Sequence, residues 1–124
     1  MSAPAVPARR SMLGAWVPVV AWAAVIFAFS SVPSLSTELG TWDTILRKLA
    51  HVAEYALLGA LLARALRRPA LAVVLAGLYA VSDEIHQTFV EGRVGAPLDV
   101  LIDTVGALLG VLAWAHVVRR RKPA

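Results

Sequence analysis

The residues of this chain that could carry acid–base chemistry gather in three of its segments. Within a segment they recur every three or four positions, as His51 and Glu54 or Asp99 and Asp103 do, so a helix would place them on one face. Carboxylates crowded together at low dielectric share protons, which makes one of them a candidate acid or base near neutral pH. The candidates for this role are His51, Glu54, Asp83, Glu84, Asp99 and Asp103.

Other polar side chains in the same part of the chain could bind a ligand. The candidate ligand-binding residues are Lys48, Gln87 and Arg93, and the two cations could hold a phosphate or carboxylate head group. A divalent metal is a candidate cofactor, because zinc and manganese accept imidazole nitrogens and carboxylate oxygens as ligands. The candidate metal ligands are His51, Glu54 and His86. Networks that only fasten helices together use the same residue types, so this alternative stays open.

The composition indicates whether the protein that positions these residues lies in water or in a membrane. Of 124 residues, 59% are apolar and 16% are charged, and the mean hydropathy is +0.71. Soluble domains are usually about 45–50% apolar and about 25% charged, so the chain is predicted to lie in a membrane. It has no cysteine, which excludes disulfides, thiol nucleophiles and cysteine-based metal sites. No serine lies in a nucleophile-elbow motif, so any chemistry would be direct acid–base or metal-assisted.

Four apolar runs predict an all-α bundle of four transmembrane helices at about 13–30, 46–66, 69–90 and 97–118. A basic leader at 1–12 and a basic tail at 119–124 flank this single domain, 13–118. Pro69 and Pro97 suit the first turns of the last two helices, and 31–44 and 91–96 have the composition of loops. The first run could instead be a cleavable signal peptide, with Ala28–Ser30 as the cleavage site.

The charges are sorted between the two ends of these helices. With the N-terminus inside, nine of the twelve basic residues and none of the eight acidic residues fall on the inner side. Lysine and arginine mark the cytoplasmic side of membrane proteins, so both termini are predicted to be cytoplasmic. The sequence pI of about 10.4 is therefore explained by the basic residues that set the topology, and these residues also attract anionic membrane lipids. No nucleic-acid partner is expected.

The three polar segments are predicted to meet inside the bundle. At ~1.5 Å per residue, Glu54, Asp83 and Asp103 lie ~15–24 Å from the inner ends of their helices, within an apolar core about 30 Å thick. A charge that faces lipid at such depth costs about 2.5–3.5 kcal/mol on insertion scales, so these groups need partners or water. Gly106 and Gly110 continue the acidic face of the last helix as a small surface, on which another helix or a second copy of the chain can pack.

Several of these segments resemble one known family. They are Ser30-Ser31-Val32-Pro33, Lys48-Leu49-Ala50-His51-Val52-Ala53-Glu54-Tyr55, Asp83-Glu84-Ile85-His86-Gln87, Gly92-Arg93 and Asp99-Val100-Leu101-Ile102-Asp103-Thr104-Val105-Gly106. They are similar to segments of the VanZ-like family, named for a teicoplanin-resistance protein. The resemblance implies a small multi-pass protein of the bacterial inner (plasma) membrane that is connected with low-level glycopeptide resistance. It implies no catalytic residues, and Glu91 departs from the proline expected before Gly92-Arg93.

Two functions and one structural role stay open for the polar residues. The first function is non-enzymatic, namely the binding of an envelope lipid, a wall precursor or a glycopeptide at the outer face of the membrane. The second is a membrane enzyme that modifies a lipid-linked envelope substrate by acid–base or metal-assisted chemistry. The site of that enzyme would be His51, Glu54, Asp83, Asp99 and Asp103. In the structural role Gln87 bridges two helices, and the cations Lys48 and Arg93 neutralise carboxylates, namely those of Asp83, Asp99 and Asp103. The polar residues then fasten the bundle without a ligand.

Overall fold

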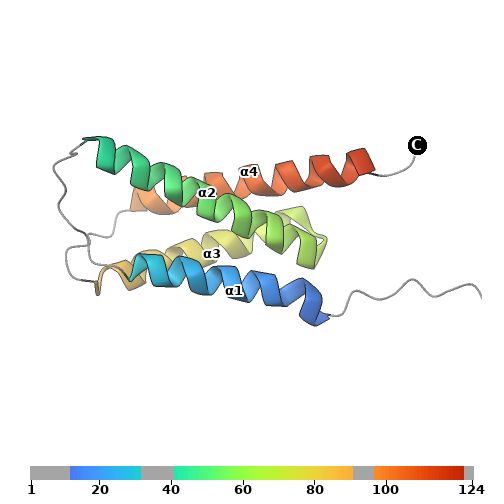
Figure 1. Ribbon diagram of the computed structural model, residues 1–124, viewed down its shortest axis with the longest axis horizontal. Coiled ribbons are helices and arrows are strands. Elements are labelled where there is room, and N and C mark those ends of the chain that lie inside the picture. Colours follow the sequence, from blue (N-terminus) through green and yellow to red (C-terminus); the bar gives the residue numbers. More distant parts are fainter. Residues whose placement is uncertain (1–11, 32–40, 91–96, 122–124) are drawn as a thin grey trace, which may run out of the picture.

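The computed structural model describes residues 12–31, 41–90 and 97–121, and the regular elements of these residues are all α-helices. The helices are α1 (Met12–Ser30), α2 (Thr41–Leu66), α3 (Pro69–Gln87) and α4 (Pro97–Arg121). They run in alternating directions and lie side by side in one bundle (Figure 1). The predicted all-α class and the number of helices are therefore confirmed for the described residues.

The helix ends differ from the prediction at three places. α2 begins at Thr41, so the prediction of a loop up to residue 44 is wrong; no proline or glycine interrupts 41–58. α3 ends at Gln87 instead of residue 90, because the backbone N–H groups of Phe89 and Val90 bond carbonyl oxygens only three residues back. α4 continues to Arg121, since arginine favours helices and its charge suits a helix C-terminus.

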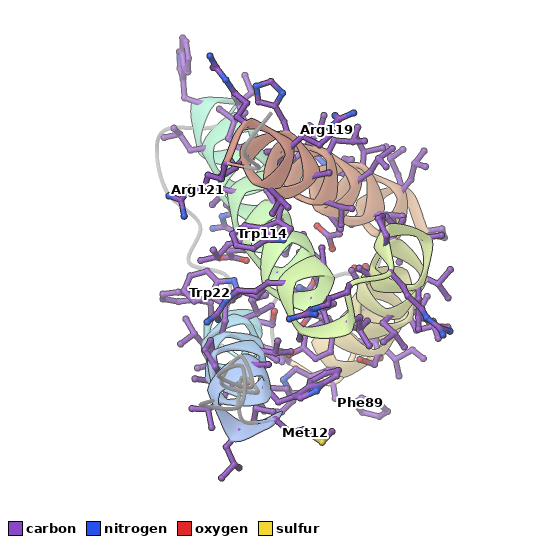
Figure 2. All side chains as sticks on the ribbon, turned by 90° about the vertical axis from the view of Figure 1, so that its right-hand side faces the viewer. Met12, Trp22, Phe89, Trp114, Arg119 and Arg121 are labelled. Atoms are coloured by element: carbon purple, nitrogen blue, oxygen red, sulfur yellow. The ribbon has the colours of Figure 1, made fainter. Side chains whose placement is uncertain are left out.

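α2 is the central helix of the bundle. It contacts the other three helices and packs most extensively against α4, whereas α1 contacts α2 and α3 but, in the described residues, not α4. The buried face of α3 is a row of alanines at every fourth position, Ala72, Ala76 and Ala80. Large apolar side chains are exposed on all four helices, and Figure 2 shows them pointing away from the bundle. Small residues on the buried face of α3 and large apolar residues on the outside of the helices suit a helical bundle surrounded by lipid.

Two glycines let α4 approach α2 closely. A methyl group on Gly106 would lie 2.7 Å from the carbonyl oxygen of Val52, and one on Gly110 would overlap the backbone of Ala56. Contacts this close leave no room for a side chain at either position. The small surface that could have joined two copies of the chain is thus covered by α2 of the same chain.

Three of the four helical segments are long and apolar enough to cross a membrane. They are Met12–Ser30, Ile45–Leu66 and Pro97–Arg121. α3 has 19 residues, but Asp83, Glu84 and His86 in its last turns lower its hydropathy. Three helices that can span a membrane make this chain a multi-pass membrane protein.

One end of the bundle is basic. The start of α1, the connection between α2 and α3, and the end of α4 all lie there (Figure 1). Figure 2 looks onto this end, with Arg119 and Arg121 in view. The described residues that form the basic end are Arg64, Arg67, Arg68, Arg119, Arg120 and Arg121. The start of α2, the end of α3 and the start of α4 lie at the opposite end, which carries the candidate site.

Candidate functional site

The polar residues of three helices come together near the end of the bundle that is opposite the basic end. α2 contributes residues from its first half, α3 from its last turns and α4 from its first turns, and these parts lie at the same end (Figure 1). The polar cluster consists of Lys48, His51, Tyr55, Asp83, Asp99 and Asp103. Five of these six residues are among those predicted from the sequence, and the sixth is Tyr55.

A histidine–aspartate pair joins α2 to α4 within the cluster. Nδ1 of His51 lies 3.2 Å from Oδ1 of Asp103, and the side chains are 21% and 2% exposed. A carboxylate bonded to one imidazole nitrogen fixes the orientation of the ring and tunes its basicity. The pair can therefore hold or move a proton, or present its nitrogen and oxygen to a metal.

A second contact joins α2 to α3. The hydroxyl of Tyr55, which is fully buried, donates a hydrogen bond of 3.1 Å to Oδ2 of Asp83. The other carboxylate oxygen, Oδ1 of Asp83, is buried and has no hydrogen-bond partner among the described residues. Leaving a buried polar atom unpaired costs about 1–3 kcal/mol, so this oxygen is a place where a ligand would be stabilised.

An ion pair lies at the more exposed side of the cluster. Nζ of Lys48 donates to Oδ1 of Asp99 at 3.1 Å, and the two side chains are 44% and 30% exposed. Ion pairs near the surface contribute little to stability, about 0–1 kcal/mol, so a ligand can replace either partner of this pair at a small cost. The cluster therefore extends from this accessible pair to the buried carboxylates of Asp83 and Asp103.

The end of α1 packs against the end of α3 through contacts that were not predicted from the sequence. Nε2 of His86 and Oγ of Ser31 are 2.9 Å apart, and the ring of His86 stacks on Phe27 with 4.1 Å between centroids. Nε2 of Gln87 donates to Oγ of Ser30 at 3.4 Å. The two serines directly follow the first apolar run. In the sequence, only their similarity to a segment of the known family indicated that they could be important. The side chains of His86 and Gln87 thus contact the end of α1 and the residue that follows it.

The remaining predicted site residues are placed as follows. Glu54 is half-buried, and its backbone oxygen accepts a bond of 2.8 Å from Nε1 of Trp22. Glu84 is buried. Among the described residues, the side chains close enough to share a metal do not include Glu54, Glu84 or His86. Arg93 lies outside the described residues.

Tyr55 is the residue of the cluster that was not predicted. It follows His51 by four positions, which places both on one face of α2, and their rings are stacked with centroids 6.5 Å apart. The spacing predicted its place on the polar face of α2, but a tyrosine in an apolar segment is commonly a core residue, so it was not among the candidate site residues. Only the position of Asp83 on the neighbouring helix reveals the hydrogen bond.

Comparison with known proteins connects this arrangement to one family. The family model described as VanZ/LLP1 matches residues 8–119, which include the whole polar cluster. No curated protein and no solved structure matches the chain.

Proposed function

The chain belongs to the VanZ-like family, and from this premise we propose that it binds an envelope ligand at the outer face of the bacterial inner membrane. The ligand carries a phosphate or carboxylate head group and is an envelope lipid, a wall precursor or a glycopeptide. Its binding lowers the sensitivity of the cell to teicoplanin. The observation that carries this proposal is the buried Oδ1 of Asp83, which has no partner among the described residues although it lies in a polar cluster.

Incomplete pairing supports a binding role over a purely structural one. A cluster that only fastens helices is expected to satisfy its buried polar atoms, because each one left unpaired costs about 1–3 kcal/mol. Asp83 does not meet this expectation, and the accessible ammonium of Lys48 lies in the same cluster. An ammonium suits an anionic head group, and the carboxylate of Asp83 suits the hydroxyl or amide donors of the same ligand.

We extend the proposal to the orientation of the chain. α3 acts as the fourth span, its polar last turns completing the crossing inside the bundle, and both termini are cytoplasmic. The basic end supports this orientation, because arginine and lysine are retained on the cytoplasmic side. The polar cluster then faces the outer leaflet.

Single cysteines test this orientation, since the chain has none of its own. Thr88 and Arg120 are exposed and lie at opposite ends of the bundle. A membrane-impermeant maleimide should label Thr88→Cys in intact cells, and Arg120→Cys only after the cells are permeabilised. The reverse pattern would place the polar cluster on the cytoplasmic side.

Asp83→Asn tests the binding function. Asparagine has the size of aspartate and can still accept the bond from Tyr55, so membrane abundance should stay unchanged. We expect the minimal inhibitory concentration of teicoplanin to fall to that of cells without the protein. Ser82→Ala, at the exposed neighbouring position, should keep protection. If the abundance of Asp83→Asn falls together with protection, the residue supports the bundle and not a ligand.

The His51–Asp103 pair favours a second candidate function. A histidine oriented by a carboxylate can serve as a general base, so the protein could modify a lipid-linked envelope substrate. Metal-assisted chemistry at the same residues is the other route. Mass spectrometry of lipid extracts from cells with and without the protein separates the functions, because only an enzyme changes the mass of a lipid.

A further inference from the structure

Three side chains of the polar cluster have the arrangement of a metal site. His51, Asp83 and Asp103 each offer one ligand atom, and these atoms all lie within 4.8 Å of one another. In two of these side chains, Nδ1 of His51 and Oδ1 of Asp103 are 3.2 Å apart. Ligands that are about 2.1 Å from a tetrahedral zinc lie roughly 3.4 Å from one another. Small side-chain rotations would therefore bring all three onto one ion.

Asp83 gives a second and independent indication of an ion. The residue is only 3% exposed, and Tyr55 donates to its Oδ2. Its Oδ1 is buried and has no donor among the described residues. A cation bound through Oδ1 of Asp83 would satisfy this oxygen, whereas the hydrogen bonds within the cluster do not.

The charges of the group also suit a divalent cation. Asp83 and Asp103 are both buried, and two ionised carboxylates at this depth in a membrane are costly unless they are paired. The ammonium of Lys48 is bonded to a different carboxylate, that of Asp99. A neutral imidazole from His51 and one divalent ion would balance both buried carboxylates.

We propose that His51, Asp83 and Asp103 bind a divalent transition metal. One imidazole nitrogen and two carboxylates are a ligand set that zinc and manganese accept. Three protein ligands leave a coordination position for water or for an atom of the envelope ligand. Tyr55 acts as a positioning residue, because its hydrogen bond orients the carboxylate of Asp83. The assignment goes beyond the proposed function and holds for any of the envelope ligands named above.

Metal titration of the purified protein tests the assignment. The full chain in detergent micelles is treated with a chelator, dialysed, and titrated with ZnCl2 or MnCl2 in an isothermal calorimeter, and bound metal is counted by mass spectrometry. We expect one ion per chain and a higher unfolding temperature with metal. Asp83→Asn and His51→Ala should weaken binding at least about tenfold, the smallest loss seen when even an outer partner of a metal ligand is removed.

A matched variant removes a histidine outside the three ligands. His86→Ala, at the contact with α1, should keep the affinity of the wild type. The proposal is overturned if the wild type binds neither ion, or if His86→Ala loses as much affinity as His51→Ala. Size-exclusion chromatography shows whether each variant is folded. If a variant is not folded, the change in the unfolding temperature of the wild type on adding metal still tests the proposal.

The metal site and the proposed function can fail separately. If the wild type binds metal but Asp83→Asn still protects cells against teicoplanin, the metal assignment stands and the binding function fails. If no metal binds and Asp83→Asn loses protection at unchanged abundance, the binding function stands without the metal.

Discussion

Gly110→Ala should destabilise the bundle by about 1–3 kcal/mol, the usual cost of forcing extra methyl groups into a packed interior. The added methyl group would lie 2.7 Å from Cα of Ala56 and would overlap the adjoining carbonyl group. Both obstacles are backbone atoms, so the helices α2 and α4 must move apart. That movement would also separate His51 from Asp103, because this pair joins the same two helices. Denaturant titration in detergent micelles measures the loss, and less of the variant should accumulate in membranes.

Gly77→Ala is the matched control for this prediction. A methyl group on Gly77 would lie 3.5 Å from Oγ1 of Thr104, which is ordinary van der Waals contact. Alanine is favoured over glycine within a helix by about 0.5–1 kcal/mol, so this variant should be as stable as the wild type or more so. Equal stability of Gly110→Ala and Gly77→Ala would show that α2 and α4 do not pack as closely as described.

His51→Leu should destabilise the protein by about 1–3 kcal/mol, the typical cost of leaving a buried hydrogen-bonding group without its partner. The variant would leave the carboxylate of Asp103, which is 1% exposed, without its imidazole partner. Replacing both residues, as in His51→Leu with Asp103→Val, removes the buried charge together with its partner. The double variant should recover most of the lost stability, because apolar residues of similar volume often replace a buried pair at little cost.

Denaturant titration of the two single variants and the double variant gives the coupling between His51 and Asp103. If the loss of stability in the double variant equals the sum of the losses in the two single variants, the two side chains do not interact as a pair. Trp22→Phe serves as a control at the contact between α1 and α2, where it removes the hydrogen bond from Nε1 to the backbone oxygen of Glu54. Its effect should add to that of His51→Leu.

The helices and the meeting of polar residues could be predicted because the apolar runs and the charges are strongly patterned. Pro69 and Pro97 mark the starts of α3 and α4 correctly, since proline is tolerated in the first turn of a helix. Spacing along three helices and a common depth in the membrane were sufficient to predict that Lys48, His51 and Asp103 meet in one cluster, but not which side chains pair there. The start of α2 was misplaced because polar residues can occupy a loop or an exposed helical turn equally well.

Contacts that depend on the position of a neighbouring helix could not be predicted. The spacing of His86 suits a metal ligand as well as that of His51, but the end of α1 lies beside it and provides Ser31 and Phe27. Gly110 could have faced another copy of the chain or another helix, and the packing of α2 decides this. Rotation of each helix about its axis determines these contacts, and apolar runs that are hydrophobic on all sides carry little information about rotation.

The central claim is that the polar cluster binds a ligand and does more than fasten the helices. The double variant His51→Leu with Asp103→Val tests it most directly, because it is expected to remain folded while it lacks two residues of the cluster. Teicoplanin protection is measured in cells whose membranes contain the double variant at the abundance of the wild type. We expect protection to be lost completely. Full protection by a stable and abundant double variant would show that these residues only hold the bundle together.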